Sequence, residues 1–103
     1  MSQDRVKPAD CTTMTEVRQG VDRLDAQIVA LLGERFRYMD AAARIKTERG
    51  AVRDEARKAQ VIANAVRHAD AADVPAAVVE DLYERLVEGS IAYEFERWDS
   101  SRA

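Results

Sequence analysis

Positively charged side chains gather in one part of this chain. The stretch AAARIKTERGAVRDEARK, residues 41–58, and one arginine shortly before it contribute seven cations: Arg35, Arg44, Lys46, Arg49, Arg53, Arg57 and Lys58. The whole chain carries 16 Lys and Arg against 19 Asp and Glu, a net charge of -3. This balance argues against a general nucleic-acid or anionic-membrane surface. The cluster therefore predicts a local site for a small anion.

Three of these cations have positions that favour a shared anion site. Arg35 falls on the apolar stripe of the first expected helix, where an unpaired guanidinium is costly to desolvate. It needs either a bound anion or a structural ion pair with Asp25 or Glu94. Lys46 follows eleven residues later, about 20° around the helix and about 16 Å along it, so the two long side chains can bracket a small molecule. Arg57 lies in the first turn of a second expected helix, where free amide groups add positive potential.

The other cations are expected to lie outside the anion site of their own chain. Arg18 lies about 25 Å from Arg35 along one helix, too far for both to bind one small ligand, but in an antiparallel dimer it reaches the partner's site. Arg44, Arg49 and Arg53 are expected to be solvated surface side chains.

Metal and disulfide chemistry find little support in the composition. Cys11 is the only cysteine and His68 the only histidine, which excludes an intrachain disulfide and leaves no zinc-type ligand cluster. No metal site and no cofactor are predicted.

A long first helix must position most of these cations. Thr13-Met14-Thr15-Glu16 is typical of a capping box, and apolar residues then recur at intervals of three and four. The pattern predicts a helix from Thr13 to about Lys46 or Thr47, preceded by an N-terminal arm, residues 1–12. Such a helix is roughly 50 Å long, whereas a compact domain of this size has a radius of gyration of about 13 Å. It must protrude unless another chain covers it.

Two further helices complete the expected architecture. Asp54 predicts the N-cap of a second helix that runs to about His68. Pro75 suits the first turn of a third helix that ends near Trp98, and the tail, residues 99–103, is expected to fray. There is no strand pattern. We therefore predict one all-α domain over residues 1–103, a three-helix protomer.

The location of the protein follows from what the sequence lacks. The N-terminus has no apolar stretch of the secretory type, and no run approaches the roughly 18 apolar residues of a membrane span. A cytoplasmic protein with neither a membrane nor a nucleic-acid partner is expected.

Several segments resemble one enzyme family. VRQGVDRLDAQIVALLGERF, AAARIK, VRDEARKAQVI and LVEGSIAYEFERW are similar to the all-helical chorismate mutases, over about residues 10–98. Asp10-Cys11 and the IAYEFERW segment look especially like the isochorismate-pyruvate lyase branch of that family, which forms salicylate. The resemblance implies an intertwined homodimer with a small-molecule substrate and two equivalent sites. Each site is built mainly by one chain and completed by an arginine of the other.

The resemblance also implies roles for individual residues. The implied substrate-binding set is Arg18 of the other chain, Arg35, Lys46, Asp54, Arg57, Val61, Ser90 and Glu94. Within it, Lys46, Glu94 and Arg35 are the implied catalytic residues. Arg18 and Arg35 would bind one carboxylate of the substrate and Arg57 the other, while Lys46 and a protonated Glu94 would bind the ether oxygen.

Two positions depart from the commoner mutase pattern. Lys58 stands where many mutases have a glutamate that helps to bind the ring hydroxyl, while Asp54 matches the family's loop acid near that hydroxyl. Glu94 stands where many have a glutamine, and a carboxyl group donates a hydrogen bond only when it is protonated.

The implied reaction suits a site made of cations. The conversion of chorismate to prephenate is a pericyclic rearrangement that needs no nucleophile or metal. The protein must select the compact conformer of the substrate and stabilise negative charge on the ether oxygen. Two alternatives remain: an isochorismate-pyruvate lyase that forms salicylate and pyruvate, and a non-catalytic dimeric helical accessory module.

Overall fold

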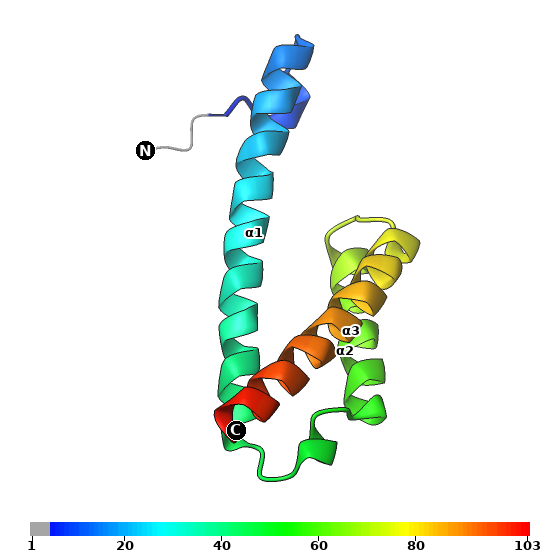
Figure 1. Ribbon diagram of the computed structural model, residues 1–103. Coiled ribbons are helices and arrows are strands. Elements are labelled where there is room, and N and C mark those ends of the chain that lie inside the picture. Colours follow the sequence, from blue (N-terminus) through cyan, green and yellow to red (C-terminus); the bar gives the residue numbers. More distant parts are fainter. Residues whose placement is uncertain (1–4) are drawn as a thin grey trace. The chain divides into compact units, whose positions relative to one another are not determined.

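The computed structural model describes residues 5–103, and every regular element in that range is helical. Figure 1 shows three long helices, α1 (Met14–Ile45), α2 (Glu55–Ala71) and α3 (Ala76–Ser101). Two short 3₁₀ helices, Pro8–Asp10 and Arg49–Ala51, precede α1 and α2. The prediction of an all-α, three-helix chain is confirmed. None of the helices within residues 5–103 is long and apolar enough to cross a membrane.

The chain divides within α1 into two compact units, one ending at Arg37 and the other spanning Tyr38–Ala103. The single domain and the intertwined homodimer stay predictions.

The capping box at the start of α1 is confirmed. The Thr13 hydroxyl accepts a hydrogen bond from the Glu16 amide at 3.1 Å, and the Glu16 carboxylate accepts one from the Thr13 amide at 3.2 Å. The Thr12 amide also donates to Glu16, at 2.8 Å. This last bond is the main reason why the pKa of Glu16 lies below its ordinary value. Local side chains thus satisfy amides that the first turn leaves without helical partners.

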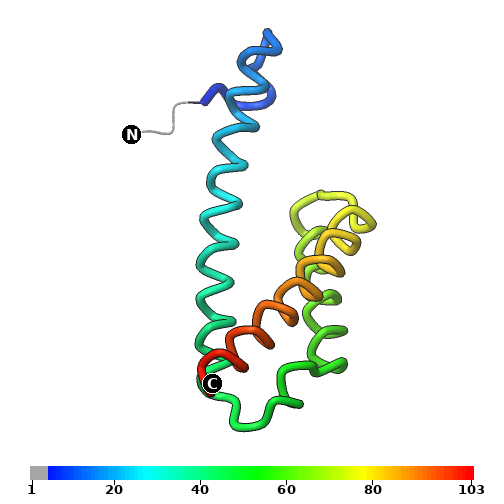
Figure 2. The backbone as a smooth tube through the Cα atoms, viewed as in Figure 1, coloured from blue at the N-terminus to red at the C-terminus, as the bar shows by residue number. Residues whose placement is uncertain are grey.

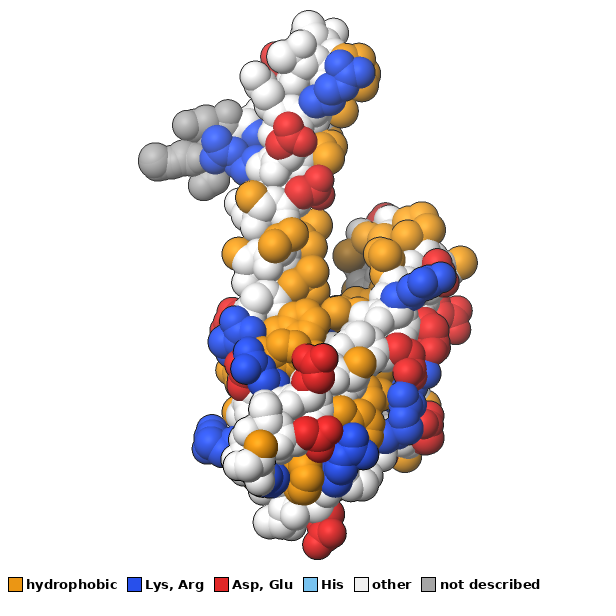
Figure 3. Space-filling view, in the orientation of Figure 1, with side chains coloured by type: hydrophobic (Ala, Val, Ile, Leu, Met, Phe, Trp, Pro, Cys, Tyr) orange, Lys and Arg blue, Asp and Glu red, His pale blue; other side chains and the backbone are white. Residues whose placement is uncertain are grey.

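The first unit leaves its apolar stripe open to solvent. Figure 3 shows apolar side chains along this part of α1. Six of them are between 38% and 65% exposed: Met14, Val17, Val21, Leu24, Ile28 and Leu31. The periodic positions of the sequence therefore form a surface in the single chain, and they do not form a core.

The second unit is built on α2 and α3, which pack against each other as a helical hairpin (Figure 2). Val52, Val87 and Ile91 form its buried cluster, with Val61 and Trp98 among the apolar side chains packed against it. The Asp54 side chain accepts a hydrogen bond from the Arg57 amide at 3.0 Å. The predicted N-cap of α2 is thus confirmed.

Ion pairs join α2 to α3 on the outside of this hairpin. Lys58 Nζ lies 2.6 Å from an oxygen of Glu84 and 2.6 Å from one of Glu88. The Arg53 guanidinium binds Glu88 at 2.7 Å. Hydrogen bonds from Arg53, which has the largest effect, and from Lys58 lower the pKa of Glu88 to about 2. Arg53, expected to be a solvated side chain, therefore belongs to an inter-helix network.

α3 continues to Ser101, three residues beyond the helix end near Trp98 that the sequence predicts. Arg49 binds the Asp99 carboxylate with two hydrogen bonds, of 2.8 and 3.1 Å. The Arg102 guanidinium donates to the carbonyls of Ala43, at 3.0 Å, and Lys46, at 2.6 Å. Contacts with segments fifty or more residues earlier hold this end of α3, and a local sequence pattern does not reveal them.

Candidate active site

Lys46 and Glu94 form the centre of the candidate site. Lys46 is the first residue after α1, Glu94 lies on α3, and Lys46 Nζ is 2.7 Å from Glu94 Oε2. Glu94 is only 4% exposed, whereas the Lys46 side chain is 30% exposed. An ammonium group has three donors, so Lys46 can hold Glu94 and still donate to a ligand oxygen. The pair joins a buried carboxylate to an accessible cation.

Two further predicted residues lie in the α2–α3 hairpin. Ser90 precedes Glu94 by one helical turn and is 4% exposed. Its hydroxyl donates to the Leu86 carbonyl at 2.7 Å. Val61 packs against the buried cluster of the hairpin, and this position suits an apolar wall.

Asp54 and Arg57 lie together at the start of α2. The Asp54 carboxylate caps the helix through the Arg57 amide, and the Arg57 guanidinium donates to Gln60 Oε1. Both residues are exposed. The cap thus fixes the backbone of Arg57, which carries an exposed guanidinium at the start of α2.

Arg18 and Arg35 lie on the part of α1 that belongs to the first unit. Arg18 is exposed and Arg35 partly exposed. Lys46 and Glu94 are in direct contact, Asp54 and Arg57 are joined by the cap, and the placement of Arg18 and Arg35 in the same site stays a prediction. The roles of all eight residues also stay predictions.

Comparison with known proteins identifies the family. The sequence matches the family described as chorismate mutase type II over residues 17–95, which is well over half of the chain. This protein belongs to the chorismate mutase type II family. It is also 33% identical to a protein named isochorismate pyruvate lyase from Pseudomonas aeruginosa, over 95 residues that cover 92% of this chain and 94% of that relative. The predicted family resemblance is confirmed.

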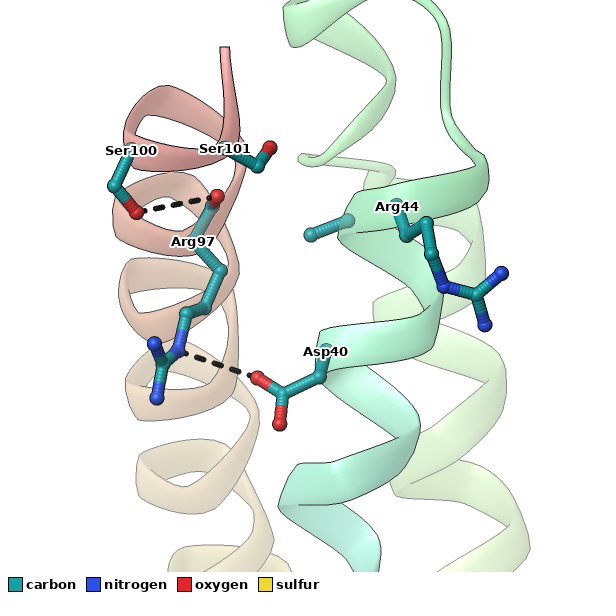
Figure 4. Close-up of a pocket in the computed structure, with 6 residues that line it drawn as sticks. Asp40, Arg44, Arg97, Ser100 and Ser101 are labelled. Carbon is teal, nitrogen blue, oxygen red and sulfur yellow. Dashed lines mark hydrogen bonds and ion pairs between the residues drawn. The ribbon is translucent and has the colours of Figure 1, made fainter. Parts of the chain in front are cut away.

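A shallow pocket of about 370 Å³ also lies in the second unit of this chorismate mutase family member. Its lining residues are Asp40, Ala43, Arg44, Arg97, Ser100 and Ser101, none of which was predicted as a site residue. Arg97 Nε is 3.2 Å from Asp40 Oδ1, and the Tyr93 hydroxyl donates to the same oxygen at 2.7 Å. Arg44 extends away from the Asp40–Arg97 pair (Figure 4). These polar groups satisfy one another and fasten α3 to the last turns of α1.

Trp98 and Arg102 contact the candidate site but were not predicted as part of it. The Trp98 indole donates to the Lys46 carbonyl at 3.0 Å, and Arg102 donates to the same oxygen at 2.6 Å. Their spacing was visible in the sequence, because Glu94, Trp98 and Arg102 follow one another at intervals of four and share one face of a helix. Within residues 5–103, no group of three or more His, Cys, Asp or Glu side chains could hold a metal ion.

Proposed function

We propose that this protein is a chorismate mutase, which rearranges chorismate to prephenate. The observation that supports the proposal most strongly is the 2.7 Å contact between Lys46 Nζ and the buried Glu94 carboxylate. A rearrangement without a nucleophile needs donors aimed at the atom on which charge develops. An accessible ammonium held against a buried carboxyl group can supply them.

In the proposed mechanism, cations first select the reactive shape of the substrate. Chorismate carries two carboxylates, and the arginine fork binds a carboxylate with two parallel hydrogen bonds. Arg35 and Arg18 of the partner bind one carboxylate, and Arg57 binds the other. Clamping both groups brings the two reacting carbon atoms together and removes the entropy cost of that arrangement from the chemical step.

Lys46 and Glu94 then act on the ether oxygen. As the carbon–oxygen bond lengthens, this oxygen becomes more negative, and donors that were weakly engaged with the neutral ether bind it more strongly. The Lys46 ammonium has three donors, whereas a carboxyl group donates only as the acid. Protonated Glu94 is the proposed second donor.

The proposed site requires a homodimer, and the exposed stripe of the first unit supports one. Six large apolar side chains of α1, from Met14 to Leu31, are exposed in the single chain. A continuous apolar stripe of this kind is uncommon on a monomer and marks an interaction surface. A second copy of α1 would cover it and bring Arg18 to the other chain's site.

The test is the conversion of chorismate to prephenate by the purified protein, followed by NMR. Wild type and Lys7→Ala should form prephenate, and Lys46→Ala should lose about 10²-fold or more in kcat, the usual cost of one oxyanion donor. Lys7 is exposed on the N-terminal arm, so its removal controls for the loss of one lysine. If Lys46→Ala matches wild type, the proposed role of the pair is wrong.

An isochorismate-pyruvate lyase activity is the second candidate. It is supported by the 33% identity, over nearly the whole chain, to a protein with that name. The same cations would bind isochorismate, which would lose pyruvate by a related pericyclic hydrogen transfer and leave salicylate. If neither substrate reacts, the accessory-module alternative gains support.

A further inference from the structure

We infer that Trp98 and Arg102 are positioning residues that hold Lys46 in its working place, an inference that rests on the proposed function of Lys46. Neither residue is expected to touch the substrate. Both act on the main chain of Lys46 at the point where α1 ends.

The end of α1 needs partners for its carbonyl groups. The last carbonyls of a helix have no intrahelical donor. Here the Ala43 carbonyl accepts from Arg102 at 3.0 Å, and the Lys46 carbonyl accepts from Arg102 at 2.6 Å and from Trp98 at 3.0 Å. The Arg102 guanidinium also lies over the Trp98 ring, 4.2 Å from its centre, so the two donors support each other.

α3 and its C-cap residue therefore bind both the side chain and the main chain of Lys46. Glu94 binds the ammonium group, while Trp98 and Arg102, one and two turns further on, bind the carbonyl. Lysine has four rotatable side-chain bonds and is easily displaced. A fixed main chain and a fixed side-chain partner on the same helix restrict where Nζ can lie.

The second unit offers a matched control. Arg97 is also a cation on the last turns of α3, and it also joins α3 to α1, through Asp40. Its guanidinium contacts Asp40 and Tyr93. A general loosening of the α1–α3 contact should therefore follow from Arg97→Ala as much as from Arg102→Ala, whereas a specific displacement of Lys46 should not.

The experiment uses the full chain with ¹³C-labelled lysine. The chain has three lysines, Lys7, Lys46 and Lys58, so each gives a separate side-chain signal, assigned by substitution. In Trp98→Phe and Arg102→Ala, the Lys46 Cε signal should move toward that of exposed Lys7, while the Lys58 signal stays. Arg97→Ala should leave the Lys46 signal in place. Circular dichroism checks that each variant is folded.

Kinetics supply the functional half of the test. Trp98→Phe and Arg102→Ala should lower kcat about tenfold, as expected for a small misplacement of a reacting group, with KM changed less than about twofold. Arg102→Lys keeps the charge but not the fork, so it should recover part of kcat. An unmoved Lys46 signal, an equal movement in Arg97→Ala, or an unchanged kcat would each overturn the inference.

The two readouts separate this inference from the proposed function. If wild type converts neither chorismate nor isochorismate, the proposed function fails. The Lys46 signal still decides whether α3 positions that side chain.

Discussion

Replacement of Glu94 by glutamine isolates the role of the buried carboxyl group. Glutamine has nearly the same shape and keeps one oxygen that can accept from Lys46, but it is neutral and always carries amide donors. In wild type, ionised Glu94 accepts from Lys46 at 2.7 Å and offers no donor to a ligand. If the ether oxygen needs a donor at this position, Glu94→Gln should keep or raise kcat/KM for chorismate, because its amide always donates. Glu94→Ala, which has no donor, should lose activity.

The size of each effect follows from the contact. Loss of one donor to a developing oxyanion costs about 10²- to 10³-fold in rate, so Glu94→Ala should lose at least about 10²-fold. The cost in stability is smaller. A hydrogen bond between charged groups contributes about 1.5–3 kcal/mol and is roughly twice as strong as a neutral one. Because the Lys46 side chain is 30% exposed to water, the net loss should be about 1 kcal/mol.

The assay is kcat/KM for chorismate at one fixed pH, with wild type, Glu94→Gln and Glu94→Ala measured side by side. Glu96→Gln is the matched control, because Glu96 is an exposed glutamate on the same helix. Thermal unfolding at fixed protein concentration measures the stability term. An equal loss of kcat/KM in Glu94→Gln and Glu94→Ala would refute the donor role, whatever the change in stability.

Two other predictions concern the dimer and the α2–α3 network. Arg18→Ala and Arg35→Ala proteins should each be inactive but dimeric, and mixing them should restore about one quarter of the sites, because half of the random dimers are hybrids with one intact site each. No recovery after verified subunit exchange would count against shared sites. Glu88 has a pKa of about 2 in the folded chain against an ordinary value of 4.5, so its ion pairs stabilise the fold above about pH 4.5 and are lost as the pH falls toward about 2. Glu88→Gln should therefore weaken the fall of Tm between about pH 4.5 and about pH 2, whereas replacement of the exposed Glu80 by glutamine should not. If Tm falls equally with pH in wild type and both variants, the network does not cause the loss of stability in acid.

The helix starts could be predicted from the sequence because the interactions that form them are local. The bonds between Thr13 and Glu16 span three residues, and so does the bond between Asp54 and the Arg57 amide. In both places the side chain lies within one turn of the backbone amide whose hydrogen bond it accepts, an amide that has no partner inside the helix. A local pattern is then sufficient.

The contacts at the end of α3 could not be predicted in the same way. Asp99 and Arg102 have partners fifty or more residues away, at Arg49, Ala43 and Lys46. Nothing in the DSSRA segment itself indicates that these residues continue a helix. Tertiary hydrogen bonds outweighed the weak local preference.

The candidate site was only partly accessible to sequence reasoning. The position of Arg35 on an apolar stripe and the spacing to Lys46 favoured an anion site, but Glu94 lies 48 residues from Lys46. Periodicity shows which face of a helix a residue occupies, not which distant side chain it meets. The family resemblance brought the two residues together, and their contact is now observed.

Competition between chorismate and isochorismate decides whether the protein is a mutase or a lyase. With equal concentrations of both in one tube, the initial ratio of prephenate to salicylate measured by NMR equals the ratio of the two kcat/KM values. Wild type should form prephenate as the main product, and Lys46→Ala should lose both products. Salicylate and pyruvate in excess from wild type would contradict the assignment as a mutase, and undiminished turnover by Lys46→Ala would contradict the proposed site.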